Sequence, residues 1–453
     1  MEVAYKSYDP DEFFGIENLE AWITLVHVCQ RWRGLVFASP RRLNLRLVCT
    51  RGKPVREMLD IWPTLPIVVD YQDIGRHQQP DVDGLIATLE HRNRVCQISL
   101  QDLRPSLFLI FTEMMQESFL ELTHLFLGAG NESPMPHPDS FLGGSAPHLR
   151  SLTLQRIPFP ELPTLLLSTK DLVELRLWNI LHSGSISPES MATCLSSLTR
   201  LEILELRFLR LHWNHNTSSR HLSSSTCIDL PALTQFHFEG VNEYIALMAQ
   251  INAPLLRHIW ITFFDQALFD LDISQFTQFI GRLKVLKTPY QSVVAFDDHC
   301  PDPQFLLYED PAKGTTLEFT VSCASLERKL PFLTALFGSS SSPFQLSSSE
   351  HLKIFAIYTP RVDWHGDTED IPWLEMLQPF TAVKGLRMNT EPAIHLGRTL
   401  QDLAGERAAE VLPSLQDIFI SEHRLPGAAR EAMRPFVAAR QLSGHPVTIH
   451  RWE

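Results

Sequence analysis

The chain has 453 residues, of which 44% are hydrophobic and 20% charged, a composition typical of a folded globular protein. Its formal net charge of −13 disfavours nucleic acid as the main partner, because phosphate backbones are bound by basic surfaces. No stretch approaches the roughly 18 apolar residues that cross a bilayer, so we expect no membrane partner.

The cysteines and the first residues indicate where the protein resides. The seven cysteines are scattered and never spaced as CxxC, which argues against a disulfide framework and a structural zinc site. The chain starts with polar and acidic residues, without the basic start and apolar run of a secretory signal. We therefore expect a reducing compartment, cytoplasmic, nuclear or both.

The first predicted element is a helix within residues 19–50. Its apolar positions recur three or four residues apart and share one face: Leu25, Val28, Trp32 and Leu35. Pro40 is predicted to end the helix, because proline disfavours helical backbone in the residue before it.

A six-residue unit, L-x-x-L-x-L with aliphatic or aromatic substitutes, recurs along the rest of the chain. Nine copies start at Leu122, Leu149, Leu172, Leu201, Leu233, Leu256, Leu352, Val383 and Leu415, and looser copies at Val95 and Leu283. From Val95 to Leu283 the starts are 23–32 residues apart, near the period of about 20–29 residues of leucine-rich repeats. The end of the unit has period two, which predicts a short strand with one buried face, and its first leucine turns inward.

The segments between the units have helical spacing, as at 106–120, 241–251 and 272–283. Strand and helix alternating at this period predict parallel strands with the helices outside, stacked because one unit cannot cover its own apolar face. The predicted fold is α/β, an irregular leucine-rich-repeat horseshoe solenoid over residues 57–453, with parallel strands on its concave face. A short helical segment in residues 1–56 precedes it. The alternative is a globular α/β protein whose strands resemble one another by chance.

Residues 288–344 break this rhythm. They contain three predicted strands, Val293–Phe296, Gln304–Tyr308 and Thr316–Ser322, separated by turn-rich links. We predict a β-rich insertion between repeats.

No motif of a nucleotide-binding loop, a hydrolase or a zinc protease is present. His212, His215 and His221 lie in a serine-rich run, and their spacing matches no standard metal site. The prediction is a non-catalytic protein with no catalytic residues, no cofactor and no metal, because no convergent set of reactive groups is found.

In each unit, the residue between the last two leucines is predicted to point onto the concave face. These residues are Phe126, Thr153, Arg176, Glu205, His237, Trp260, Lys287, Ala356, Arg387 and Phe419, and two positions further on lie Trp178, Arg207, Glu239 and Tyr358. Aromatic side chains beside arginine are typical of protein-binding hot spots. The candidates for contact with a protein substrate are Arg176, Trp178, Glu205, Arg207, His237, Trp260, Arg387 and Phe419. Arg176, Trp178, Arg207 and Trp260 form the predicted centre.

The run VCQRWRGLVFASPRRL, which starts at Val28, resembles the second half of an F-box. Together with WPTLPIVV, DLPALTQFHFEG and FVAARQLSGHPVTIHRWE, it is similar to a large family of fungal, basidiomycete-type F-box proteins with degenerate leucine-rich repeats. The resemblance implies a substrate receptor of an SCF-type cullin–RING ubiquitin ligase. Its F-box would dock on the adaptor subunit, with Leu25, Val28, Trp32, Leu35 and Pro40 as candidate contacts, and its repeats would hold an unknown protein substrate.

The chain departs from this family pattern in one respect. An F-box opens with a helix of the type L-P-x-E-[IVL]-L, and the residues before Val28 contain no such helix. Two interpretations therefore stay open: a ubiquitin-ligase receptor, or a leucine-rich-repeat interaction scaffold with no ligase role.

Overall fold

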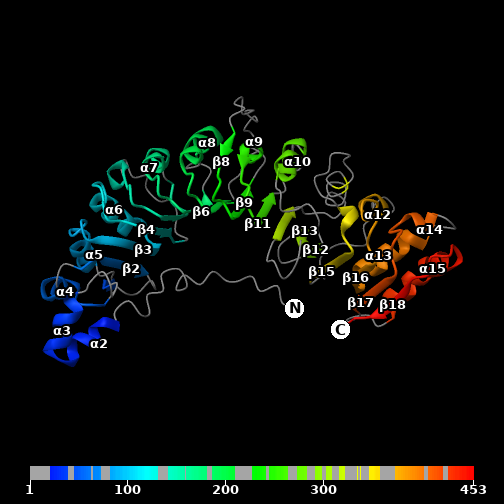
Figure 1. The fold of residues 1–453 in the computed structure, drawn as a ribbon, viewed down its shortest axis with the longest axis horizontal. Coiled ribbons are helices and arrows are strands. Elements are labelled where there is room, and N and C mark those ends of the chain that lie inside the picture. Colours follow the sequence, from blue (N-terminus) through cyan, green and yellow to red (C-terminus); the bar gives the residue numbers. More distant parts are fainter. Residues whose placement is uncertain are drawn as a thin grey trace. The chain divides into compact units, whose positions relative to one another are not determined.

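The computed structural model describes residues 21–38, 45–50, 52–62, 65–72, 82–130, 141–158, 160–180, 186–209, 227–240, 244–263, 273–282, 291–297, 303–308, 316–321, 334, 337, 346–357, 373–401, 407–421 and 427–452. The chain forms two compact units, unit 1 (Met1–Ile186) and unit 2 (Ser187–Glu453). Each contains a largely parallel sheet with helices packed on one side, so the fold is α/β (Figure 1).

The described part of unit 1 contains two N-terminal helices followed by strands that pair in chain order. Its elements are α2 (Ala21–Val28), α3 (Gln30–Phe37), β1 (Leu47–Thr50), α4 (Val55–Ile61), β2 (Ile67–Gln72), α5 (Val82–Leu89), β3 (Val95–Leu103), α6 (Pro105–Met114), β4 (His124–Ala129), the 3₁₀ helix η2 (Leu142–Gly144), β5 (Ser151–Gln155), α7 (Leu162–Ser168) and β6 (Glu174–Ile180). Each strand from β1 to β6 is parallel to the next.

Unit 2 continues with the same alternation of strands and helices. Its elements are α8 (Pro188–Ser197), β7 (Ile203–Phe208), β8 (Ile228–Asp229), β9 (Gln235–Gly240), α9 (Ile245–Gln250), β10 (Ile251–Asn252), β11 (His258–Phe263), α10 (Ile273–Arg282), β12 (Gln291–Asp297), β13 (Pro303–Tyr308), β14 (Thr316–Val321), η8 (Leu346–Ser348), β15 (His351–Ile357), α12 (Trp373–Leu377), β16 (Gly385–Asn389), α13 (Thr390–Gln401), α14 (Arg407–Glu410), β17 (Asp417–Ser421), α15 (Ala428–Leu442) and β18 (Thr448–Arg451). Strands β8 and β10 form a separate two-stranded parallel sheet.

The six-residue unit folds the same way at most of its copies. Its first residue is buried, with 0–2% of its surface exposed at Leu122, Leu149, Leu172, Leu201, Leu233, Leu256, Val383 and Leu415. Its backbone N–H donates to the carbonyl three residues earlier in a recurring turn, as from Leu172 to Thr169 at 3.3 Å and from Leu201 to Leu198 at 3.1 Å. The strand starts two residues later, as the period-two pattern predicts.

Backbone hydrogen bonds connect each turn to the preceding repeat. Arg150 donates to the carbonyl of Thr123 at 2.7 Å, and Val173 donates to that of Arg150 at 2.8 Å. In unit 2, Gln416 donates to the carbonyl of Lys384 at 2.9 Å in the same way. The parallel pairing of strands therefore extends into the turns, which satisfies backbone groups that would otherwise be buried without partners.

The three strands predicted within residues 288–344 are present as β12, β13 and β14, which form an antiparallel meander. Strand β14 pairs in parallel with β11, strand β12 pairs in parallel with β15, and β13 lies antiparallel between β12 and β14. The prediction of strands in this region is confirmed. The order in space is β11-β14-β13-β12-β15, so the three meander strands lie in the reverse of their chain order. Because they pair with β11 and β15, they are part of the sheet of unit 2.

The N-terminal helices differ from the prediction of one continuous helix. The backbone of Cys29 is extended, with φ −162° and ψ 167°, and it divides the segment into α2 and α3. Trp22, Val26 and Val36 pack with Leu45 and Leu65, so both helices rest on the start of the sheet. That start, β1, lies within the segment 1–56, for which the sequence predicts only helix and linker.

Candidate functional site

The open face of each sheet is the side that the helices leave uncovered, and it carries the predicted partner contacts. Side chains alternate between the two sides, as in β7, where Leu204, Leu206 and Phe208 are buried and the residues between them are partly exposed. Figure 1 shows the helices of each unit on the opposite side of these strands. Because the chain divides into two units, the open face of each is described by itself.

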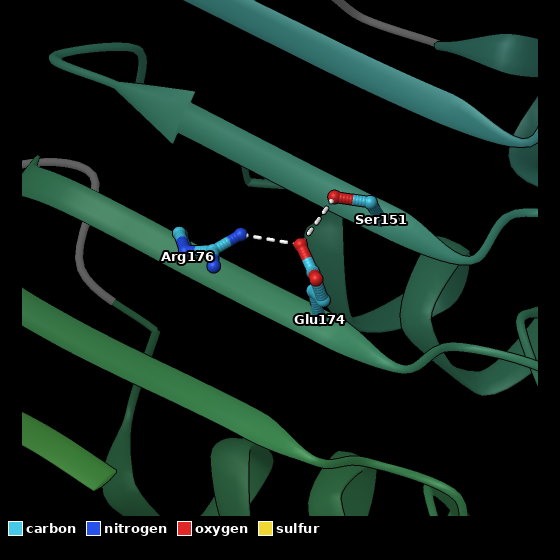
Figure 2. A network of polar contacts seen from close by, with 3 residues as sticks. All are labelled: Ser151, Glu174 and Arg176. Atoms are coloured by element: carbon cyan, nitrogen blue, oxygen red, sulfur yellow. Dashed lines mark hydrogen bonds and ion pairs between the residues drawn. The ribbon is translucent and has the colours of Figure 1, made fainter. Parts of the chain in front are cut away.

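In unit 1, Arg176 belongs to a polar network across β5 and β6 (Figure 2). Its guanidinium lies 2.5 Å from Oε2 of Glu174, which also accepts a hydrogen bond from Oγ of Ser151 at 3.1 Å. The Arg176 side chain is only 11% exposed and that of Glu174 30%. The network therefore orients Arg176 on the sheet and leaves it little free surface for a partner.

Trp178 is buried, so the prediction that it is an exposed contact is wrong. Only 7% of its surface is exposed, and its ring lies edge-on to Phe126, which is 4% exposed, with ring centroids 6.3 Å apart. Gly128 and Gln155 occupy the aligned positions on β4 and β5, and the absence of a side chain at Gly128 leaves room for the Phe126 ring. Thr153, whose register partners on the neighbouring strands are Phe126 and Arg176, is also buried, with 0% exposed.

His124 on β4 lies at the same level of the sheet as Ser151 and Glu174. Its Nδ1 lies 2.9 Å from Oγ1 of Thr123 and 3.2 Å from Nε2 of Gln97. Desolvation lowers the pKa of His124, the Glu174 carboxylate opposes this shift, and Arg46 and Arg150 add to it. The open face of unit 1 is thus closely hydrogen-bonded within itself.

In unit 2, three of the predicted contacts are aligned across neighbouring strands. Glu205, His237 and Trp260 are register partners on β7, β9 and β11. The Trp260 ring contacts two histidine rings, with its centroid 6.0 Å from that of His237 and 5.8 Å from that of His258. Trp260 is partly exposed, in contrast to Trp178.

The neighbouring row contains an ion pair between Arg207 and Glu239, with Nε 3.1 Å from Oε2. Burial, aided by the positive charge of Arg207, lowers the pKa of His237 to about 3. His237 is therefore neutral at physiological pH and presents an uncharged ring beside Trp260.

Arg387 and Phe419 are brought together near the end of unit 2. The guanidinium carbon of Arg387 lies 5.2 Å from the centre of the Phe419 ring and 5.7 Å from that of Trp452. The His450 ring stacks on Phe419 at 5.0 Å, and its Nε2 lies 2.7 Å from Oδ1 of Asp417. Sequence reasoning misses His450 and Trp452, because the last strand, TIHR, matches the repeat unit poorly.

Lys353 also belongs to this open face, and the prediction of Ala356 at the corresponding position is wrong. Lys353 is the register partner of Arg387, whereas Ala356 lies three residues further along β15. The six-residue unit in this repeat therefore starts at Ser349. Ser349 is 0% exposed, and its N–H donates to the carbonyl of Leu346, as the N–H of the inward leucine does in other copies. Because serine replaces leucine at position 349, the sequence pattern places the start of this six-residue unit three residues too late, at Leu352. Lys287 and Tyr358 lie outside the described residues.

The candidate adaptor contacts are partly exposed apolar side chains. Val28 is 62% exposed, Trp32 47% and Leu35 59%, whereas Leu25 packs against the buried cluster around Trp22. Trp32 and Leu35 lie three residues apart on α3 and share one face of that helix. Pro40 lies outside the described residues.

The described part of the chain shows no arrangement suited to metal chemistry. Within the described ranges, no group of three or more His, Cys, Asp or Glu side chains could hold a metal ion. Burial raises the pKa of the Cys194 thiol to about 11, so this thiol stays protonated at neutral pH. His212, His215 and His221 lie outside the described residues.

Two further observations concern the chain as a whole. The described helices are all too short or too polar to traverse a bilayer. Comparison with protein-family models and with curated protein sequences finds no match for this chain.

Proposed function

We propose that the chain is a non-catalytic substrate receptor of an SCF-type cullin–RING ubiquitin ligase, built as an irregular leucine-rich-repeat solenoid and acting in the cytoplasm, the nucleus or both. Helices α2 and α3 dock the adaptor subunit. The open face of the strands holds a protein substrate.

The recurring turn with an inward leucine is the observation that supports a repeat architecture. The same backbone hydrogen bond and the same buried leucine precede strands in both units, followed each time by a parallel strand. Repeats of this kind expose a broad sheet face, and proteins built from them use that face for binding. On this face Glu205, Arg207, His237, Trp260, Arg387 and Phe419 are the partly exposed candidates, with Arg176 at the edge of its own network.

Exposed apolar side chains on α3 support the docking role. Trp32 and Leu35 expose about half of their surfaces, whereas Val36 on the same helix is 3% exposed and anchors it to the core. Burying such side chains against a partner is the main driving force for helix-in-groove contacts. The anchored inner face holds the outer face in place for docking.

The test is adaptor binding by the purified full-length chain. Substituting Trp32→Ala together with Leu35→Ala is expected to weaken adaptor binding by about a hundredfold, because each truncation removes about 1–2 kcal/mol of buried apolar contact. The matched control combines Leu255→Ala with Leu442→Ala, which removes exposed apolar side chains of 53% and 89% exposure elsewhere. Binding is measured by titration calorimetry.

Two outcomes decide against parts of this proposal. Unchanged adaptor affinity in the Trp32 and Leu35 variant would show that α3 is not the docking surface. No adaptor binding by the unmodified chain would leave the second candidate, a leucine-rich-repeat scaffold outside the ubiquitin pathway.

A further inference from the structure

The last strands of unit 2 carry a basic–aromatic patch on their open face. It comprises Lys353 on β15, Arg387 on β16, Phe419 on β17, His450 on β18, and Trp452 just after β18. The first four are successive register partners across the four strands. Trp452 reaches back over the patch to Phe355, with ring centroids 5.5 Å apart. The patch is therefore one continuous surface formed by neighbouring strands.

Two cations in this patch lie side by side, and within the described ranges no carboxylate pairs with either of them. Lys353 and Arg387 are register partners on adjacent strands, about 4.8 Å apart, where like charges repel. Among the described residues, neither has a carboxylate partner: Glu350 pairs with Lys384 at 2.9 Å, and Asp417 with His450 at 2.7 Å. Burial first, and Arg387 second, lower the pKa of Lys353. An anion between these two cations would relieve their repulsion.

The aromatic rings hold the arginine in a defined orientation. The guanidinium lies over both Phe419 and Trp452, at 5.2 Å and 5.7 Å from their ring centres. Stacking of this kind fixes the plane of the guanidinium and leaves the N–H groups at its edge directed away from the ring faces. A planar fork of donors beside a second cation matches a carboxylate, which accepts two parallel hydrogen bonds.

We propose that this basic–aromatic patch binds an acidic, extended segment of a partner protein, with an aspartate or glutamate carboxylate held between Lys353 and Arg387. The proposal rests on the function proposed above in one respect, namely that the open face binds protein. It names the chemistry of the substrate: carboxylate side chains interspersed with apolar ones that pack on Phe419 and Trp452.

A protein partner fits this patch better than a nucleic acid does. The chain carries a formal net charge of −13, which opposes the approach of any polyanion and opposes a long phosphate backbone more strongly than a short segment with a few carboxylates. Asp417 lies within the same strand set and holds His450, so the patch offers two cations and not a continuous basic groove. A short acidic segment can satisfy both cations and avoid Asp417.

The experiment uses the full-length chain and three fluorescent probes at physiological salt. The first is a peptide of about ten residues, long enough to cross the four strands, with aspartates alternating with leucine and serine. The second has asparagine in place of each aspartate. The third is single-stranded oligouridine. Binding is measured by fluorescence anisotropy.

The decisive variant is Lys353→Gln combined with Arg387→Gln. Its matched control is Lys384→Gln combined with Arg434→Gln, which changes the net charge equally but removes cations that already pair with Glu350 and Glu431. We expect the acidic peptide to bind the unmodified chain, to bind the control equally well, and to lose at least about tenfold in affinity with the decisive variant. The asparagine peptide is expected not to bind.

Other outcomes would overturn the proposal. They are no binding of the acidic peptide, equal losses in the decisive variant and the control, equal binding of the asparagine peptide, or binding of oligouridine alone through Lys353 and Arg387. Adaptor binding by the same protein is measured in parallel. Retained adaptor binding with no peptide binding rejects only the acidic-segment proposal, whereas peptide binding without adaptor binding rejects only the ligase role.

Discussion

Arg440 shows how a single charged residue can stabilise the packing of several elements. It lies on α15 and is 1% exposed. Its guanidinium donates hydrogen bonds to four backbone carbonyl groups. The acceptors are Ala408 and Ala409 on α14, and Pro413 and Leu415 before β17, at 3.1–3.4 Å. The carbonyl groups at the end of a helix have no hydrogen-bond donors within that helix, and here Arg440 donates to them. Its role is therefore structural.

Replacing Arg440 by alanine is expected to lower the free energy of unfolding of unit 2 by about 3 kcal/mol. The substitution leaves buried carbonyls without donors and creates a cavity, and these two effects add. The control Arg434→Ala removes an exposed arginine from the same helix, and a change within about 0.5 kcal/mol is expected. Urea denaturation followed by circular dichroism measures both. Equal losses would mean that Arg440 does not cap α14.

His237 is expected to make stability depend on pH. Burial, aided by Arg207, lowers its pKa to about 3, below the ordinary value near 6.5 that it regains on unfolding. The unfolded chain therefore binds the proton more readily, so the stabilising contribution is complete above about pH 6.5 and is lost as the pH falls towards 3. In His237→Gln this loss is absent.

The difference is measured from urea midpoints at a series of pH values. From pH 6 to pH 4, the unmodified chain should lose up to about 1 kcal/mol more per pH unit than His237→Gln. The control is His445→Gln, which changes an exposed histidine elsewhere in unit 2. Parallel curves for all three proteins would show that His237 is not held neutral by the fold.

The residues that sequence could not place are those whose surroundings decide their exposure. The alternation of strand residues correctly predicts the face on which Trp178 and Trp260 lie, but not that Phe126 covers the first while the second stays partly exposed. Whether a tryptophan on the open face is covered depends on the size of side chains two strands away. The local sequence pattern does not predict this. The frame error at Ala356 has a different origin, because Ser349 takes the place of the leucine that marks a unit.

At the scale of elements, the inward leucine is the sequence feature that best predicts where a strand begins. Where it is present, the strand begins two residues later, and the predicted strands and their parallel direction follow from it. Helices are predicted less well. Two predicted spacers, 106–120 and 241–251, overlap the shorter helices α6 and α9, and α2 and α3 are separate because the extended backbone at Cys29 interrupts them. Helix ends depend on tertiary packing more than on propensity.

The packing of α13 on α15 depends on a glycine. A β-carbon at Gly397 would lie 2.6 Å from the carbonyl oxygen of Ala432 and 3.0 Å from its Cβ, which is too close for either backbone to accept. Gly397→Ala is therefore expected to destabilise unit 2 by about 1–3 kcal/mol, by forcing the helices apart.

A matched substitution separates this effect from helix propensity. A β-carbon added at Gly34 on α3 would meet no atom within 4 Å, so Gly34→Ala should be neutral or stabilise by up to about 1 kcal/mol. Thermal unfolding of the two variants beside the unmodified chain measures the contrast. A neutral Gly397→Ala would show that α13 and α15 can separate without cost.

At the scale of the molecule, the two units share one construction principle but differ in the character of their open faces. In unit 1 the face is occupied by its own contacts, with Glu174, Arg176 and Ser151 joined in one network and Trp178 buried. In unit 2, Trp260, Arg387 and Lys353 remain partly exposed. Composition read along the repeats predicts an aromatic and basic face throughout, but only contacts between strands show where that face remains accessible.

The meander between β11 and β15 has a consequence for how this sheet can change in length. Strands β12 and β14 run parallel to their outer neighbours only because a third strand, β13, reverses the chain between them. An antiparallel meander with an odd number of strands lets the strands on both sides of it run in the same direction. With an even number of strands, the two flanking strands would run in opposite directions. Insertion or deletion of a whole hairpin, two strands at a time, is therefore compatible with every later repeat keeping its direction. Loss of β13 alone would reverse one of its neighbours and with it the side on which the following helix packs.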